Sequence, residues 1–222
     1  MPLQNRVTPS GEIISTPHRG LFTGNRGIIH DPKTRTLLSK RWASPAWLTC
    51  VCEFRGRRRD VMGGRSWTEL FFLDEATAFA AGHRPCFFCR RDDALRFRAA
   101  WEQGNGVTHA SAPDIDAVLH RERLSGRKKR LHARTMPLEE LPDGAMVQEG
   151  VESYLIAQGR ALQWSPAGYR AALSAIDGAM LLTPPSTLRA FIAGYKPLLH
   201  PSAMTLMAEA TSSSSFEART SR

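Results

Sequence analysis

Four cysteines, arranged in two pairs, constrain this chain more than any other feature of its sequence. Cys86 and Cys89 form a CxxC pair, Cys50 and Cys52 form a CxC pair upstream, and the chain has no further cysteine. A CxxC spacing lets both sulfurs reach one ion at ~2.3 Å. Alternate residues of a strand point to one face, so Cys50 and Cys52 can also converge. The pattern predicts one structural zinc site with Cys50, Cys52, Cys86 and Cys89 as ligands.

Other uses of these cysteines stay open at the level of sequence. A histidine can take the place of one upstream cysteine, and the candidates are His83, His120 and His132. A redox CxxC pair usually follows a βαβ opening, which is missing here, and four unligated thiols are the remaining alternative. The first residues lack the apolar core of a signal peptide, and no apolar run reaches the ~20 residues of a membrane span. We therefore expect a cytoplasmic protein with no membrane partner, where reducing conditions favour metal binding over disulfides.

The segment around the second cysteine pair resembles a known family. Residues 72–91, FLDEATAFAAGHRPCFFCRR, are similar to the zinc-binding N-terminal domain of the Ada DNA-repair proteins. In that domain a strand and an alanine-rich helix lead into a Gly-aromatic-Arg-Pro-Cys-x-x-Cys segment. The resemblance covers residues 46–92 and implies that Cys86 and Cys89 bind zinc, with Cys50 and Cys52 as the upstream pair. It implies a small zinc module that contacts the DNA backbone. Nothing in the chain resembles the Pro-Cys-His-Arg segment of the methyltransferase domain.

The charge of the chain is the second informative feature. Thirty Lys and Arg face 21 Asp and Glu, which gives a net charge of +9. A basic surface attracts polyanions, and nucleic acid is the commonest one. Phe87 and Phe88 lie inside the CxxC pair, where core packing is favoured over stacking on bases. The candidate nucleic-acid-binding residues are Arg55, Arg57, Arg58, Arg59, Arg84, Arg90, Arg91, Arg127, Lys128, Lys129 and Arg130.

Periodicity and turn residues predict an α+β fold with short strands. Strands are expected over residues 11–15, 46–55, 69–73, 146–148, 153–157, 161–164 and 181–183. Helices are expected over 75–81, from Pro85 onward, and over 90–102, 113–124 and 187–193, the last capped by Ser186. Residues 20–32 are expected to form a loop, because Gly24-Asn25 and Asp31-Pro32 are turn signals. Residues 78–85 and 190–197 are similar, and two explanations stay open: a degenerate internal repeat, or a common helix-stop signal of Gly followed by a basic residue and Pro.

These predictions divide the chain into five parts. The parts are a loop-rich segment (1–45), an Ada-like zinc module (46–104), a basic helical connector (105–144), a strand-rich C-terminal portion with a candidate degenerate repeat of the 72–85 unit (145–207) and a disordered tail (208–222).

The functional hypothesis is a zinc-stabilised protein that binds the phosphate backbone of DNA or RNA. One alternative is an enzyme acting on nucleic acid, either a metal-dependent nuclease or a DNA-repair protein. Another is a zinc-stapled protein-interaction module. The chain has no P-loop, dinucleotide-binding fingerprint, HExxH or nucleophile elbow, so no catalytic residue is assigned. Acidic pairs such as Asp114 with Asp116 are equally well explained as residues in the first turns of helices.

Overall fold

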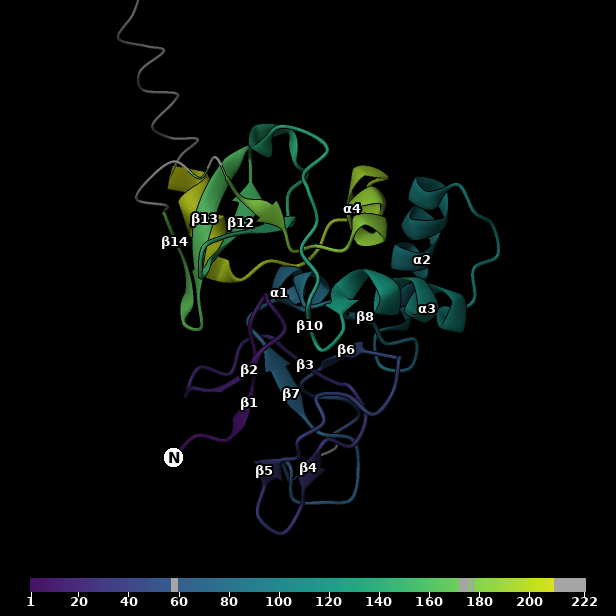
Figure 1. The fold of residues 1–222 in the computed structure, drawn as a ribbon, viewed down its shortest axis with the longest axis vertical. Helices are drawn as coiled ribbons and strands as arrows, with labels where there is room; N and C mark the ends of the chain where they lie inside the picture. The colour runs from purple at the N-terminus through teal and green to yellow at the C-terminus, as the bar shows by residue number, and fades with distance from the viewer. Residues whose placement is uncertain (57–59, 172–175, 177, 210–222) are drawn as a thin grey trace, which may run out of the picture.

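The computed structural model describes residues 1–56, 60–171, 176 and 178–209. It has the predicted α+β architecture, with two main sheets, the labelled α-helices α1 to α4 and a further helix over residues 201–209 among the described residues. In Figure 1 the N-terminal sheet lies below, the C-terminal sheet lies above it, and helix α1 lies between them. None of the described helices is long and apolar enough to cross a lipid bilayer.

The N-terminal sheet has six strands in the order β2-β1-β7-β3-β6-β8. Its strands are β1 (Gln4–Val7), β2 (Ile13–Ser15), β3 (Phe22–Asn25), β6 (Leu48–Val51), β7 (Leu70–Phe72) and β8 (Arg84–Pro85). A small separate hairpin joins β4 (His30–Asp31) to β5 (Thr36–Leu37). The sheet takes strands from both sides of residue 45, so the predicted loop-rich segment and zinc module form one unit.

The prediction of a loop over residues 20–32 is wrong, because this segment contains β3. This strand pairs antiparallel with β6 on one side and with β7 on the other. Gly24 looks like a turn residue in the sequence, yet it serves close packing: a Cβ there would lie 2.0 Å from the Leu48 carbonyl oxygen. A glycine in a strand often marks such a close approach of another backbone.

Helix α1 (Glu75–Ala80) is the centre of the molecule, and all six of its residues are buried. Asp74 caps it, as predicted, by accepting a hydrogen bond from the Thr77 amide at 2.9 Å. Ala76 and Ala80 pack toward the C-terminal sheet, whereas Phe79 packs among the other helices. The alanines allow close packing on several sides of this short helix, which has no solvent-exposed face.

Three longer helices pack beside α1. They are α2 (Arg91–Asn105), α3 (Ala112–Arg123) and α4 (Pro185–Ile192). Phe79, Phe97 and Tyr195 meet at centroid distances of 5.0–5.4 Å and form the core between them. Helix α4 begins with Pro184 as its N-cap, so the predicted Ser186 cap is wrong. The Ser186 hydroxyl instead donates a hydrogen bond to the Glu122 carboxylate at 2.6 Å.

The C-terminal sheet is antiparallel and has the order β14-β13-β12-β11-β15. Its strands are β11 (Met146–Glu149), β12 (Glu152–Ala157), β13 (Arg160–Ser165), β14 (Gly168–Ala171) and β15 (Met180–Leu181). The predicted turn at Gln158-Gly159 joins β12 to β13, and both residues have positive φ, as type I′ hairpin turns require. The connector contains a small hairpin of β9 (Leu124–Ser125) and β10 (Lys128–Lys129), followed by a 3₁₀ helix, η1 (Leu138–Glu140).

The end of the described chain differs from the predicted tail. Residues 201–209 are helical, so 208 and 209 belong to a helix, and 210–222 lie outside the described residues. The suspected repeat is limited to a shared helix end. In both segments the residue after the glycine donates back to an alanine: His83 to Ala78 at 2.9 Å and Tyr195 to Ala190 at 3.0 Å. Beyond this point the first segment enters β8, whereas in the second segment the described chain, up to residue 209, contains no further strand.

Candidate metal centre

Cys50 lies on β6, on the sheet face opposite helix α1. Its neighbours on that face come from the adjacent strands. Thr23 of β3 pairs with Cys50, and Phe71 of β7 pairs with Thr23. The opposite face carries Phe72, which packs with Ala78 and Ala81 of the α1 segment. Strand alternation therefore places Cys50 away from the α1 side of the sheet.

The CxxC segment is a loop that is anchored at both ends. Arg84 and Pro85 form β8, which runs parallel to β6, so the prediction that Pro85 opens a helix is wrong. The Cys86 amide donates to the Thr49 carbonyl at 3.0 Å, which places Cys86 beside the strand that carries Cys50. The Arg90 amide then donates to the Cys86 carbonyl at 2.9 Å, and α2 begins at the next residue.

Arg90 anchors the C-terminal end of this loop through its buried side chain. Its guanidinium bridges the Glu75 carboxylate at 2.8 Å and the Asp93 carboxylate at 2.7 Å, and its side chain is 3% exposed. It also lies over the Phe22 ring, 4.4 Å from the centroid. Sequence reasoning missed Glu75 as a support of this site, because an acidic residue in the first turn of a helix usually needs no further explanation.

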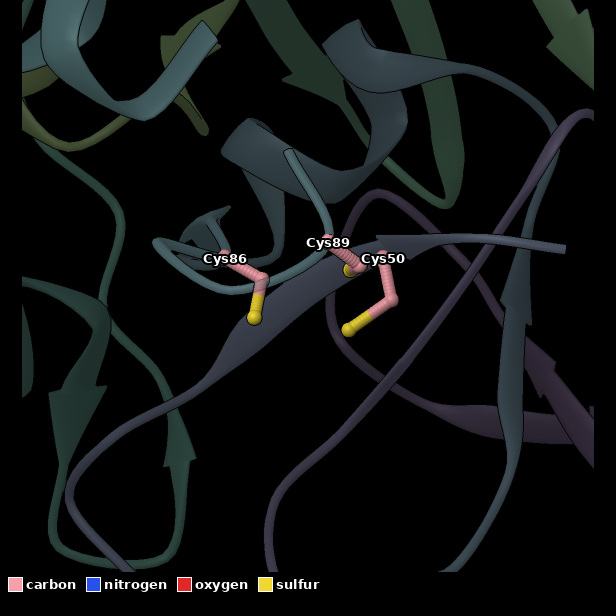
Figure 2. Close-up of side chains that lie close together, drawn as sticks. All are labelled: Cys50, Cys86 and Cys89. Carbon is pink, nitrogen blue, oxygen red and sulfur yellow. The ribbon is translucent and has the colours of Figure 1, made fainter. Parts of the chain in front are cut away.

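Three sulfurs meet at this point. The Sγ atoms of Cys50, Cys86 and Cys89 all lie within 4.8 Å of one another. Figure 2 shows the three side chains turned toward a common region, one from the strand and two from the loop. Two sulfurs that bind one ion tetrahedrally at ~2.3 Å stand about 3.8 Å apart. The arrangement can therefore hold one metal ion with small side-chain adjustments.

The electrostatics of the cluster favour the deprotonation of one of its three thiols, that of Cys86. Hydrogen bonds from the side chains of Cys50 and then Cys89 lower the pKa of Cys86 from 9.0 to about 2. The same contact with Cys86, together with burial, raises the pKa of Cys50 far above its ordinary value. The pKa of Cys89 is raised as well, so Cys86 is the thiol whose ionised form the cluster favours. Thiolates are the form of cysteine that binds metal ions, so the cluster is prepared for a cation.

The predicted four-cysteine set is not assembled in the structure. Cys52 is absent from the cluster, and its Sγ faces the Leu21 carbonyl oxygen at 3.5 Å. The histidine alternatives also lie elsewhere. His83 is fully buried and its Nε2 accepts from Arg26, His120 Nδ1 contacts Arg123, and His132 Nε2 contacts the Glu122 carbonyl. Among the described residues, the cluster therefore supplies three protein ligands.

A cavity of about 580 Å³ adjoins the cluster on the open face of the sheet. All four cysteines contribute to its wall. Phe88, between the two loop ligands, is 64% exposed at the rim and packs against Phe54 with ring centroids 5.2 Å apart. The prediction that Phe88 packs in the core is therefore wrong. A metal ion held by these three cysteines would have a fourth coordination position that can be reached from the cavity.

The predicted basic residues fall into two groups. Arg84 is 4% exposed and makes two hydrogen bonds to the Asp116 carboxylate, at 2.7 and 2.8 Å. Arg90 is bound internally as described above. Both guanidiniums therefore support the CxxC loop, and neither is available to a surface ligand. This is a correction to their prediction as nucleic-acid contacts, which arose because sequence alone does not show whether an arginine is buried.

The remaining basic candidates lie at the surface or outside the described residues. Arg55 and Arg91 are exposed, and Arg55 lies over the Phe54 and Phe88 rings at 5.0 and 5.9 Å. The exposed residues of the connector are Arg127, Lys128 and Arg130, whereas Lys129 is half-buried. Arg57, Arg58 and Arg59 lie outside the described residues.

Comparisons with known proteins found no protein or family similar to this chain. No family model matches the chain, and neither the curated proteins nor the solved structures contain a match.

Proposed function

We propose that the protein binds one zinc ion through Cys50, Cys86 and Cys89 and uses the surface around it to bind nucleic acid. The observation that carries the proposal is the convergence of three thiols from two distant segments at the edge of a cavity. Zinc is the common ion for thiolate-rich sites with this spacing. Bound there, it ties β6 to the CxxC loop and holds the rim of the cavity rigid.

The rim has the composition of a nucleic-acid-binding surface. Phe88 is exposed, Phe54 lies beside it, and the Arg55 guanidinium covers both rings. Arg19 adds a further positive charge at the same cavity. Aromatic rings stack on unpaired bases, and arginines neutralise the adjoining phosphates. The surface therefore fits a single-stranded segment of DNA or RNA better than a closed duplex.

Fluorescence anisotropy with labelled oligonucleotides tests this proposal. We expect Phe88→Ala to weaken single-strand binding about tenfold, because one stacked base contributes about 1–3 kcal/mol. Arg55→Ala should weaken binding at low salt and reduce the salt dependence by about one phosphate contact. Arg160, an exposed arginine on β13 in the other sheet, provides the matched control as Arg160→Ala. Absence of binding by the zinc-loaded protein at low salt would refute the proposal.

The position of the three thiols at the wall of a cavity supports a second candidate function. A zinc-bound thiolate beside a cavity is a nucleophile, so the protein could accept an alkyl group from damaged DNA. The sulfur would attack the alkyl carbon of a phosphotriester and form an S–C bond. The C–O bond to the phosphate would break, and the phosphodiester anion would leave. Intact-mass analysis after incubation with methyl-phosphotriester DNA should then show one added methyl group per chain. An unchanged mass would leave the zinc ion with a structural role alone.

A further inference from the structure

A second cavity, of about 720 Å³, lies on the other side of the N-terminal sheet from the metal centre. Strand β6 separates the two: Leu48 and Cys50 line the metal-centre cavity, whereas Trp47, just before the strand, lines the second one. Six cationic side chains and a single carboxylate, that of Glu12, line this second cavity. The cations are Arg26, Arg41, Arg123, Arg127, Lys128 and Lys129. We refer to it as the basic cavity.

Two of these cations are buried without a carboxylate partner. Arg26 is 2% exposed and donates to the Gly11 carbonyl and to His83 Nε2. Arg123 is 1% exposed and donates to the carbonyls of Gly82 and Pro45 and to His120 Nδ1. These acceptors are all uncharged. Burying a charge is costly unless an opposite charge compensates for it, so the pair is electrostatically incomplete.

The same side chains have unused hydrogen-bond donors. Arg26 Nη2 and Arg123 Nε are buried and have no acceptor in the structure. Both guanidiniums also lie against the Trp47 ring, each 3.9 Å from a ring centroid, which keeps the two charges close together. Buried polar groups are nearly always satisfied, and those that are not require an explanation such as an unseen ion. Both donors belong to side chains that line the basic cavity, and an anion bound beside them would supply acceptors and counter-charge.

Lys129 adds a third charge to this pair. Its ammonium donates to the Ala80 carbonyl. Burial, followed by repulsion from Arg26 and Arg123, lowers the pKa of Lys129 to about 7. Burial likewise lowers the pKa of Arg123 to about 9. These shifts run in the direction expected for buried cations, and the carboxylates of Asp116 and Glu122 oppose them only in part.

We propose that the basic cavity binds a phosphate monoester through Arg26, Arg123 and Lys129. A phosphate dianion matches several cations at once and accepts hydrogen bonds from arginine forks in a way that a single carboxylate does not. The cavity is larger than a phosphate group, and Trp42, Ile13 and Leu131 add apolar surface to its wall. Its volume lies within the ~300–1,000 Å³ of small-molecule sites. The ligand is therefore an organic phosphate of nucleotide size.

Two sources share this chemistry, a free nucleotide and the phosphorylated end of a nucleic acid. Isothermal titration of the full chain with adenosine, adenosine monophosphate and inorganic phosphate tests the site itself. We expect the monophosphate to bind, inorganic phosphate to bind more weakly and adenosine not to bind. Oligonucleotides with and without a 5′-phosphate then separate the sources. A preference for the phosphorylated end identifies nucleic acid, whereas equal binding of the two oligonucleotides identifies the free nucleotide.

Lys129→Met is the decisive variant, because it removes one charge and only one hydrogen bond to the protein. We expect it to weaken binding of the monophosphate at least tenfold and to leave the melting temperature of the ligand-free protein unchanged or raised. Lys196→Met, at an exposed position outside the basic cavity, should behave as the wild type. Arg26→Met should also abolish binding; its fold is checked by circular dichroism.

The proposed phosphate site and the proposed nucleic-acid surface can be tested independently of one another. Phe88→Ala and Arg55→Ala alter the metal-centre rim and should leave binding of the monophosphate unchanged. The inference is overturned if neither the monophosphate nor the 5′-phosphorylated oligonucleotide binds the wild-type protein at low salt. It is also overturned if Lys129→Met binds the monophosphate as tightly as the wild type does.

Discussion

Asp74 does more than cap helix α1. It is fully buried, and besides the Thr77 amide and hydroxyl its carboxylate accepts from the Tyr169 hydroxyl at 2.9 Å and the His200 amide at 3.1 Å. One side chain thus joins the strand and helix before the CxxC loop to β14 and to the segment after α4. Burial raises the pKa of Asp74, and the hydrogen bonds from Thr77 oppose this shift most strongly.

At the scale of this residue, we predict that Asp74→Ala destabilises the protein by about 3 kcal/mol. The substitution leaves several buried donors without an acceptor, and each such loss costs about 1–3 kcal/mol before relaxation. Asp74→Asn keeps one oxygen acceptor and should cost less. Urea denaturation measures both. Ser111→Ala removes the exposed cap of α3 and should cost about 1 kcal/mol. Equal losses for Asp74→Ala and Ser111→Ala would contradict the linking role of Asp74.

Two helix ends with similar sequences have different surroundings. Gly82 after α1 and Gly194 after α4 both have positive φ, +89° and +102°. A Cβ on Gly82 would lie 2.6 Å from the Cβ and Cδ atoms of Arg123, whereas a Cβ on Gly194 meets nothing within 4 Å. Gly82 therefore serves both the chain reversal before the CxxC loop and the close packing of α3. Gly194 serves the reversal alone.

At the scale of these elements, the glycines make a matched pair. Gly194→Ala should cost about 1–2 kcal/mol, the cost of a left-handed backbone for a residue with a Cβ. Gly82→Ala adds overpacking against Arg123, which typically costs a further ~1–3 kcal/mol. Thermal unfolding of the two variants measures the difference. A Gly82→Ala protein as stable as Gly194→Ala would show that Arg123 can move away at little cost.

Some features of these elements could be predicted from the sequence and others could not. The place of Cys86 and Cys89 in one cysteine cluster was predictable from their spacing, as was the α1 cap at Asp74 from its residue type. The roles of Cys52 and β3 were not, because they depend on strand pairing between distant segments. Arg84 and Arg90 were wrongly predicted to lie at the surface for the same reason. Their carboxylate partners, Asp116 and Glu75, are distant in sequence.

The whole molecule is held together by contacts that pass through α1. The N-terminal sheet, the helical group and the C-terminal sheet each pack on a different side of this short helix. The CxxC loop leaves the end of α1 and returns to it through the ion pair of Arg90 with Glu75. A metal ion at the three cysteines would therefore stabilise the sheet, the loop and the start of α2 together.

At the scale of the whole molecule, we predict that chelation lowers the stability of the folded protein. A ligand present at 1,000 times its Kd adds about 4 kcal/mol, which corresponds to roughly 10 °C in a chain of this size. Thermal unfolding with and without a strong chelator measures the shift. Cys50→Ser should already have the lower melting temperature and should not respond to the chelator.

The metal content of the purified protein is the most direct test of the central claim. Elemental analysis should find about one zinc ion per chain in the wild type and in Cys52→Ser. It should find almost none in Cys50→Ser, Cys86→Ser or Cys89→Ser, although each variant still contains three cysteines. Absence of zinc from the wild type, or its loss in Cys52→Ser to the same degree as in the others, would contradict a centre built from Cys50, Cys86 and Cys89.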